Sequence, residues 1–169
     1  YSKEVVGLAN GLPVSLEVIG DEPKEMISQA RTLSSLSDNV YVKIPITYTS
    51  GKSTLDTISE LVNDGVKQNI TAIFTLEQVK EVLPVLKDSE AIISVFAGRL
   101  YDIGLDAAKL LKEIALYVHS NSNCSVLWAS PRMHYDHTTA QLSDCDIITM
   151  SCQMYKKMSL IGKSPKDYS

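Results

Sequence analysis

The sequence predicts an α/β fold built around a parallel sheet. Short apolar runs alternate along the chain with longer segments in which apolar residues recur every three or four positions. The first pattern is typical of buried strands, and the second of helices that pack by one face. Because parallel strands must be joined by a crossover, usually a helix, this alternation indicates a parallel sheet. Six such units would form either an open doubly wound sheet or most of a (β/α)8 barrel.

The predicted strands cover, in order, residues 12–20, 40–47, 69–74, 91–98, 125–130 and 146–150. Helices are predicted over residues 23–36, 53–64, 76–86 and 105–119, with a polar helix after the fifth strand and another helix at the start of the chain. Local signals mark their ends. Pro23 suits a first helical turn, Gly65 lies just beyond a helix end, and Thr75 can cap the next helix. Pro84, inside that next helix, argues against a regular final turn.

Composition indicates a single domain over residues 1–169 and excludes several classes of partner. The chain is 44% hydrophobic, which is enough for a full core. Its net charge of −4 and sequence pI of 5.3 argue against a nucleic-acid surface. No apolar run is long enough to span a bilayer, so no membrane contact is predicted. The 3 cysteines lack metal-ligand or redox spacing, which favours reduced thiols and a cytoplasmic location.

Polar side chains recur on one face of successive predicted strands. Residues two apart on a strand share a face. The polar positions are Ser15 and Glu17, Lys43, Asn69 and Thr71, Ser94, and Ser130 with Arg132. Lys43 is the most unusual, because it interrupts an apolar strand and lysine is among the residues least often buried.

A single lysine or glutamate on a strand is usually an edge residue with an exposed head group. Their joint occurrence on successive strands argues against that interpretation here. The pattern suits a cavity near the carboxyl ends of barrel strands, where enzymes with a (β/α)8 barrel have their active sites. The chain also lacks a GxGxxG or phosphate-loop motif, which weighs against a nucleotide-binding doubly wound sheet.

These segments resemble the transaldolase family from about Gly11 to Met158. VKIPIT resembles the family's Schiff-base strand, with Lys43 as the nucleophile, and SLEV resembles the strand that carries the acid/base, here Glu17. NITAIFTLEQ resembles the family's N-x-T segment. SVFAGRLYD resembles the next strand, and ASPR the phosphate-binding end of a later one.

The resemblance implies a role for each of these residues. Burial would favour the free amine of Lys43, which would attack a ketose carbonyl. Glu17 would act through a water molecule that Thr71 orients. Asn69 and Ser94 would bind hydroxyls of the dihydroxyacetone unit. Arg99 and Arg132, with Ser130, would hold the sugar phosphate by charge-assisted hydrogen bonds. Phe96 would line the substrate site.

By resemblance, the reaction transfers dihydroxyacetone from fructose 6-phosphate or sedoheptulose 7-phosphate to an aldose phosphate in the pentose phosphate pathway. It needs no cofactor and no metal. The nearest alternative is a fructose-6-phosphate aldolase, but those enzymes carry glutamine and tyrosine where Glu17 and Phe96 stand. An inactive barrel fragment that binds sugar phosphates is a further alternative.

Family members begin with two further βα units, which supply a catalytic aspartate and an asparagine, and they continue into a final helix. The sequence contains none of these, so we expect an incomplete TIM-type (β/α)8 barrel with strands 3 to 8, as a fragment or the ordered part of a longer gene product. Such an arc leaves two strand edges open. A homo-oligomer or a partner chain is therefore expected to cover the opening.

His134, Asp136 and His137 could in principle supply metal ligands, but no fourth ligand accompanies them. We expect this cluster to begin a helix after the phosphate strand, and we predict no metal site.

Overall fold

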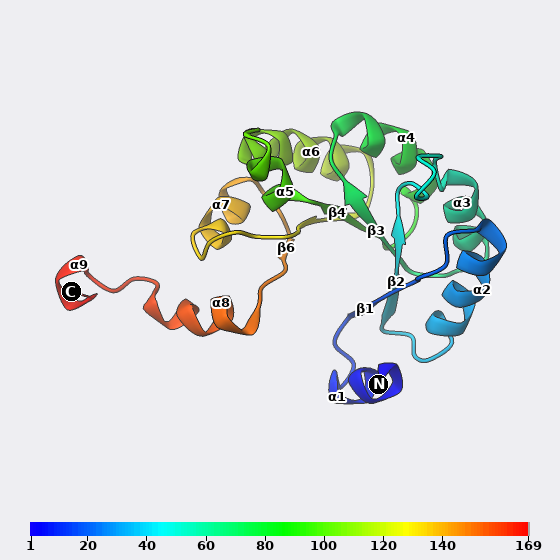
Figure 1. Ribbon diagram of the computed structural model, residues 1–169, viewed down its shortest axis with the longest axis horizontal. Helices are drawn as coiled ribbons and strands as arrows, with labels where there is room; N and C mark the ends of the chain where they lie inside the picture. Colours follow the sequence, from blue (N-terminus) through cyan, green and yellow to red (C-terminus); the bar gives the residue numbers. More distant parts are fainter. Residues whose placement is uncertain (169) are drawn as a thin grey trace.

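The computed structural model describes residues 1–168 and contains one sheet of six parallel strands. The strands are β1 (Val14–Glu17), β2 (Val40–Pro45), β3 (Gln68–Ile73), β4 (Ile92–Val95), β5 (Ser125–Trp128) and β6 (Ile147–Ile148). They lie side by side in sequence order. A doubly wound sheet reverses its strand order at a switch point, and this sheet does not. It curls into a half-barrel (Figure 1). The strand order and this curvature agree with part of a (β/α)8 barrel and not with a doubly wound sheet.

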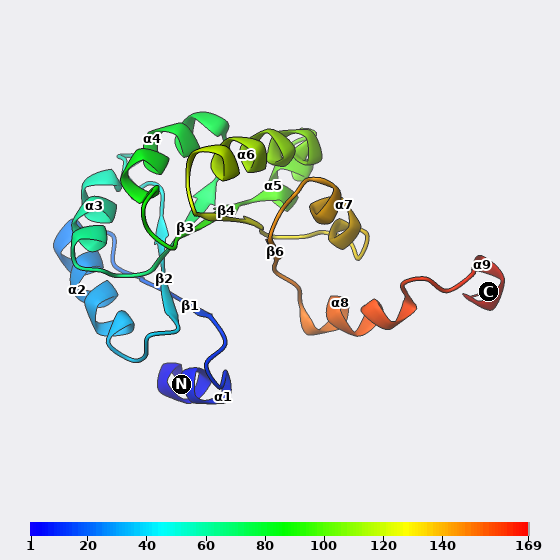
Figure 2. The same ribbon diagram turned by 180° about the vertical axis from the view of Figure 1, so that it is seen from behind.

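The helices between strands lie on the convex side of the sheet (Figure 1). They are α2 (Pro23–Ser34), α3 (Leu55–Asn63), α4 (Leu76–Leu86), α5 (Ala97–Asp102), α6 (Ala107–Asn121) and α7 (Asp136–Leu142). Outside this layer lie α1 (Ser2–Leu8) and a C-terminal arm, which consists of α8 (Cys152–Lys156), the 3-10 helix η1 (Lys157–Leu160) and α9 (Pro165–Tyr168). Both views show α1 and the arm projecting from the half-barrel (Figures 1 and 2).

The main core lies between the sheet and these helices, and strand alternation explains its composition. On β2, Val40, Val42 and Ile44 are buried in this core, whereas Tyr41 and Lys43 point to the concave face. Trp128 of β5 is fully buried among the core residues, as expected for wall packing. Burial of one such large apolar side chain contributes about 1.5–3 kcal/mol. The concave face is thereby left for polar groups.

The predicted helix signals are confirmed. Pro23 is the first residue of α2, and Gly65 has a φ of +73° after the end of α3. Thr75 and Gln78 form a reciprocal capping box at the start of α4. The helix predicted over residues 76–86 is confirmed, because α4 continues past Pro84 to Leu86. Pro84 removes one N–H donor and crowds the carbonyl four residues before it, but the buried face of α4 holds the last turn in place.

The fourth predicted strand, residues 91–98, is too long. The strand ends at Val95 and α5 begins at Ala97, so Gly98 and Arg99 are helical. A close packing contact explains the early turn. A Cβ placed on Gly98 would lie 1.6 Å from the carbonyl oxygen of Ser130, so only glycine fits at this point of α5.

Both ends of the sheet are open within residues 1–168. β1 pairs only with β2, and β6 only with β5, in this part of the chain. Neither α1 nor any of the three helices of the arm contributes a buried residue. No helix in the described range is long and apolar enough to cross a membrane.

Candidate active site

The polar side chains predicted to share a face do meet on the concave side of the half-barrel. The strand register brings Glu17 of β1 level with Lys43 of β2, and Lys43 level with Asn69 of β3. Because all strands are parallel, their carboxyl ends lie at one edge of the sheet, which gathers these groups together.

Lys43 and Glu17 form an ion pair across the first two strands. The Nζ of Lys43 donates to Oε2 of Glu17 at 2.9 Å. The side chains are 28% and 49% exposed, respectively, so Lys43 is less buried than we expected from its apolar strand. The reason is its position beside the edge strand β1, which leaves the pair open to solvent on one side. The pair also means that the carboxylate touches the amine directly.

A chain of hydrogen bonds links three polar side chains from β1, β3 and β4. Asn69 Nδ2 donates to Ser15 Oγ at 3.0 Å, and Ser94 Oγ donates to Asn69 Oδ1 at 2.6 Å. Asn69 and Ser94 are both buried. These bonds use both ends of the Asn69 amide and therefore define its orientation.

Thr71 completes the polar layer. Its side chain is buried, and its hydroxyl has no hydrogen-bond partner among the described residues. Other atoms of Thr71 line a hollow of about 350 Å³ on the concave face. The hollow is lined by Ser15, Lys43, Asn69, Thr71, Ser94, Phe96, Leu127, Ala129, Ser130 and Thr149. A ligand hydroxyl in this hollow would find several donors and acceptors within it.

A small apolar cluster accompanies the polar layer on the same face. Ile92, Leu127 and Ala129 are buried together, with Tyr41 and Phe96 packed against them. This cluster is separate from the main core on the other side of the sheet. An apolar surround of this kind shields the polar groups from water and strengthens their electrostatic interactions.

The predicted phosphate residues gather where β4 and β5 end. The guanidinium of Arg99, on α5, lies 4.9 Å from the centre of the Phe96 ring, and Phe96 packs edge-on against Phe74. Arg132 donates through Nε and Nη2 to the two carboxylate oxygens of Asp102, at 2.9 and 2.5 Å. Arg132 also donates through Nη1 to the Ser130 carbonyl at 3.2 Å.

Electrostatics at this rim are dominated by the Asp102–Arg132 pair. The hydrogen bond from Arg132 lowers the pKa of the Asp102 carboxyl, and the charges of Arg132 and Arg99 lower it further. The same hydrogen bond raises the pKa of Arg132. Both groups are therefore charged across the physiological pH range.

Most of the predicted site residues are brought together, and a few contribute differently from expectation. Lys43, Asn69, Thr71, Ser94, Phe96 and Ser130 line the hollow. Glu17 does not line the hollow but contacts Lys43, which does. Arg99 and Arg132 are exposed and do not line the hollow.

Ser15, Thr149 and Asp102 were not among the predicted site residues. Ser15 was placed on the same strand face as Glu17, but it was given no role in the site. Asp102 gave no such signal, because the helix that presents it was predicted as strand and loop.

The His134, Asp136 and His137 segment performs a structural task. Asp136 is buried, and its Oδ2 accepts hydrogen bonds from the backbone N–H groups of Arg132 and Met133 at 2.6 and 3.0 Å. It thus fixes the turn after β5, and α7 starts at this residue as expected. Within residues 1–168, no group of three His, Cys, Asp or Glu side chains is placed to hold a metal ion.

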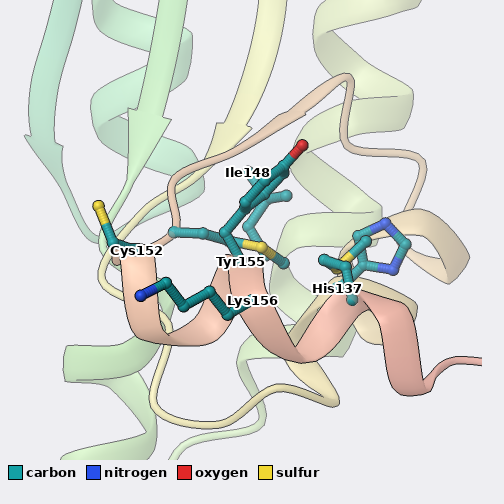
Figure 3. Close-up of a pocket in the computed structure, with 7 residues that line it drawn as sticks. His137, Ile148, Cys152, Tyr155 and Lys156 are labelled. Carbon is teal, nitrogen blue, oxygen red and sulfur yellow. The ribbon is translucent and has the colours of Figure 1, made fainter.

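A larger hollow, of about 670 Å³, lies between the C-terminal arm and the half-barrel. Figure 3 shows Cys152, Tyr155 and Lys156 of α8 beside Ile148 of β6 and His137 of α7. Its walls are mainly apolar, with Met150 and Met158 completing them. It lacks the convergent polar groups of the concave hollow, so we do not assign the chemistry to it.

Comparison with known proteins identifies the family. A family model described as Transaldolase/Fructose-6-phosphate aldolase matches residues 3–167. A probable transaldolase of Desulforapulum autotrophicum is 32% identical over 164 residues, which cover 96% of this chain and 71% of that protein. A probable transaldolase of Streptococcus agalactiae is 40% identical over 111 residues, or 66% of this chain and 48% of that protein. The matched residues therefore span between about half and about seven tenths of the length of these relatives.

Solved structures show a likeness of fold alone. A mandelate oxidase mutant with a monooxide FMN adduct superposes with a TM-score of 0.62 at 14% identity, covering 92% of this chain and 53% of that one. Mandelate oxidase with (S)-2-phenylpropionate gives a TM-score of 0.62 at 13% identity, covering 88% of this chain and 51% of that one.

Proposed function

Because the chain belongs to the transaldolase/fructose-6-phosphate aldolase family, we propose that its concave hollow transfers dihydroxyacetone from a ketose phosphate to an aldose phosphate. The observation that carries the proposal is the Lys43–Glu17 contact of 2.9 Å beside the Ser15–Asn69–Ser94 chain. A nucleophilic amine, an adjacent acid/base and fixed hydroxyl-binding groups are what Schiff-base chemistry on a sugar requires. In this proposal the six strands are strands 3 to 8 of a single barrel domain.

The first step is attack by the Lys43 amine on the C2 carbonyl of fructose 6-phosphate or sedoheptulose 7-phosphate. Glu17 takes the proton that the ammonium must lose, and it can do so directly because the two groups are in contact. The C2 oxygen receives this proton and a second one that the attacking nitrogen loses, and it then leaves as water and produces an iminium.

The iminium then accepts the electron pair of the C3–C4 bond while the C4 hydroxyl gives its proton to the Glu17 carboxylate, which is again unprotonated after the dehydration. An aldose phosphate departs, and a three-carbon enamine stays on Lys43. This enamine attacks the aldehyde of the acceptor, and water then hydrolyses the new iminium and frees the amine. In this proposal Thr71, which lines the hollow, orients that water.

Substrate binding divides between the two ends of the site. Asn69 and Ser94 hold hydroxyls of the dihydroxyacetone unit from the polar layer. Phe96 packs beside the sugar, while Ser130, Arg99 and Arg132 receive the phosphate at the rim. Arginine suits this role because its planar fork matches phosphate geometry.

Borohydride trapping tests the proposal. The intact mass of the protein is measured after reduction in the presence of fructose 6-phosphate. We expect a stable increase equal to a reduced dihydroxyacetone unit, because C3–C4 cleavage leaves that unit on Lys43. Lys43→Ala should show none, whereas the matched control Lys24→Ala, which removes an exposed lysine from the outer helix α2, should be labelled normally.

Other outcomes have distinct meanings. An adduct with the mass of the whole sugar would mean that carbon–carbon cleavage does not occur. Steady release of free dihydroxyacetone without any acceptor would identify a fructose-6-phosphate aldolase instead. No adduct on a sample with native circular dichroism would refute the Schiff-base proposal for this chain.

A further inference from the structure

We propose that Asp102 is a positioning residue for the phosphate end of the site. In this role, which rests on the function proposed above, its carboxylate occupies one edge of the Arg132 guanidinium and leaves the other edge to receive the phosphate. Asp102 does not itself contact the substrate.

The hydrogen bonds of Arg132 define which edge is available. A guanidinium has two edges that can each donate a parallel pair of hydrogen bonds. Asp102 takes the Nε–Nη2 edge, through bonds of 2.9 and 2.5 Å. Nη1 makes a single bond, to the Ser130 carbonyl, and Nη2 a single bond, to Asp102, so each of these nitrogens keeps one N–H for a further acceptor. One bidentate contact with a phosphate is therefore still open.

Arg132 is also held at its backbone and against α5. The buried Asp136 carboxylate binds the Arg132 N–H at 2.6 Å and thus fixes the start of the side chain. At the other end, the central guanidinium carbon lies 3.2 Å from the point where a Gly98 Cβ would stand. Asp102 completes this arrangement as the group that sets the rotation of the guanidinium.

Charge could argue for the opposite effect, since a carboxylate repels phosphate. That repulsion acts between exposed groups. Physiological salt, with a Debye length of about 8 Å, weakens it. The Arg132 and Asp102 side chains are 39% and 53% exposed, respectively. The orienting effect is not screened in this way, because it consists of two short hydrogen bonds that remove side-chain freedom before the ligand arrives. We therefore expect positioning to outweigh repulsion.

The first test is Asp102→Asn, which keeps the size of the side chain but places an amide donor against an arginine donor. We expect the KM for fructose 6-phosphate to rise about three- to tenfold with little change in kcat. The dissociation constant for inorganic phosphate, measured by calorimetry, should rise by a similar factor. Borohydride trapping with unphosphorylated dihydroxyacetone should be unchanged, because that ligand does not reach the rim.

A second variant, Asp102→Glu, separates position from charge. It retains the carboxylate but moves it by one methylene, so it should also weaken phosphate binding if position matters. The control is Asp144→Asn, which breaks a comparable exposed pair with Lys112 at a residue whose φ of +56° asparagine tolerates. Its phosphate affinity should equal that of the wild type.

Equal or tighter phosphate binding by Asp102→Asn would overturn the proposal and identify the carboxylate as a simple repulsive group. A loss of dihydroxyacetone trapping in the same variant would overturn it too, since that result indicates a general structural defect. The calorimetric measurement does not depend on turnover. If the wild type formed no Schiff base but bound phosphate in an Asp102-dependent way, the proposed function alone would fail.

Discussion

At the residue scale, the site depends on side chains that hold one another rather than on isolated groups. The Lys43–Glu17 pair is partly exposed, and pairs of that kind contribute only about 0–1 kcal/mol to stability. Asn69 is bonded on both sides, to Ser15 and Ser94. These contacts therefore matter more for orientation than for the free energy of unfolding.

Gly98 is the glycine at which an added Cβ would meet the shortest contact. Gly98→Ala would bring a Cβ to within 1.6 Å of a backbone oxygen, so α5 or the turn at Ser130 must shift. Overpacking of this kind lowers the free energy of unfolding by about 1–3 kcal/mol. We expect a lower urea midpoint, together with weaker phosphate binding, because Arg99 and Asp102 move with α5.

Gly7→Ala is the matched control for that variant. Gly7 lies within α1 and a Cβ there meets nothing within 4 Å. Its urea midpoint should stay constant or rise slightly, since alanine favours helix over glycine. Equal midpoints for Gly98→Ala and the wild type would show that the close contact relaxes without penalty.

At the element scale, helix starts are set by local side chains as much as by packing. The capping box of α4 satisfies backbone donors through Thr75 Oγ1 and the Gln78 side chain. The N-terminus of α2 has no side-chain cap and relies on Pro23 in its first turn. Two helices of one layer thus begin by different means.

Thr75→Ala should lower the free energy of unfolding by about 1 kcal/mol, because the N–H of Gln78 loses its acceptor. Chemical denaturation followed by circular dichroism measures this change. Thr32→Ala serves for comparison, since the exposed Thr32 hydroxyl bonds only to the carbonyl of Ser28 in its own helix. That variant should match the wild type, and a drop equal to that of Thr75→Ala would contradict the capping argument.

At the scale of the whole molecule, stability resides in the half-barrel and not in its projections. The main core is formed by the sheet and its outer helices, whereas α8, η1 and α9 bury no residue. The arm carries exposed Tyr155, Ile161 and Tyr168 side chains. Its contacts with the sheet are those around the hollow in Figure 3.

A chain that ends at Met150 should therefore unfold with a free energy within about 1 kcal/mol of the full chain, since so little apolar area is lost. Urea denaturation monitored by far-ultraviolet circular dichroism gives the comparison. A loss of more than about 2 kcal/mol would mean that the arm supports β6 and α7 far more than its burial indicates.

Local sequence patterns were sufficient to predict the strands, most helices and the polar face. Alternation along a strand is a local property, so Lys43, Asn69 and Ser94 could be assigned to one side before any fold was known. Proline, glycine and threonine signals are local in the same sense, which is why Pro23, Gly65 and Thr75 were predicted correctly.

How these elements meet depends on contacts between residues that are far apart in the sequence. Strand order separated the half-barrel from a doubly wound sheet, and an edge position left Lys43 more exposed than its apolar neighbours indicated. The helix α5 and the Asp102–Arg132 pair depend on a contact between Gly98 and Ser130, residues that come together only when β4 and β5 lie side by side. Such contacts leave no periodic pattern in the chain, because their energy depends on distances in space and not on spacing in sequence.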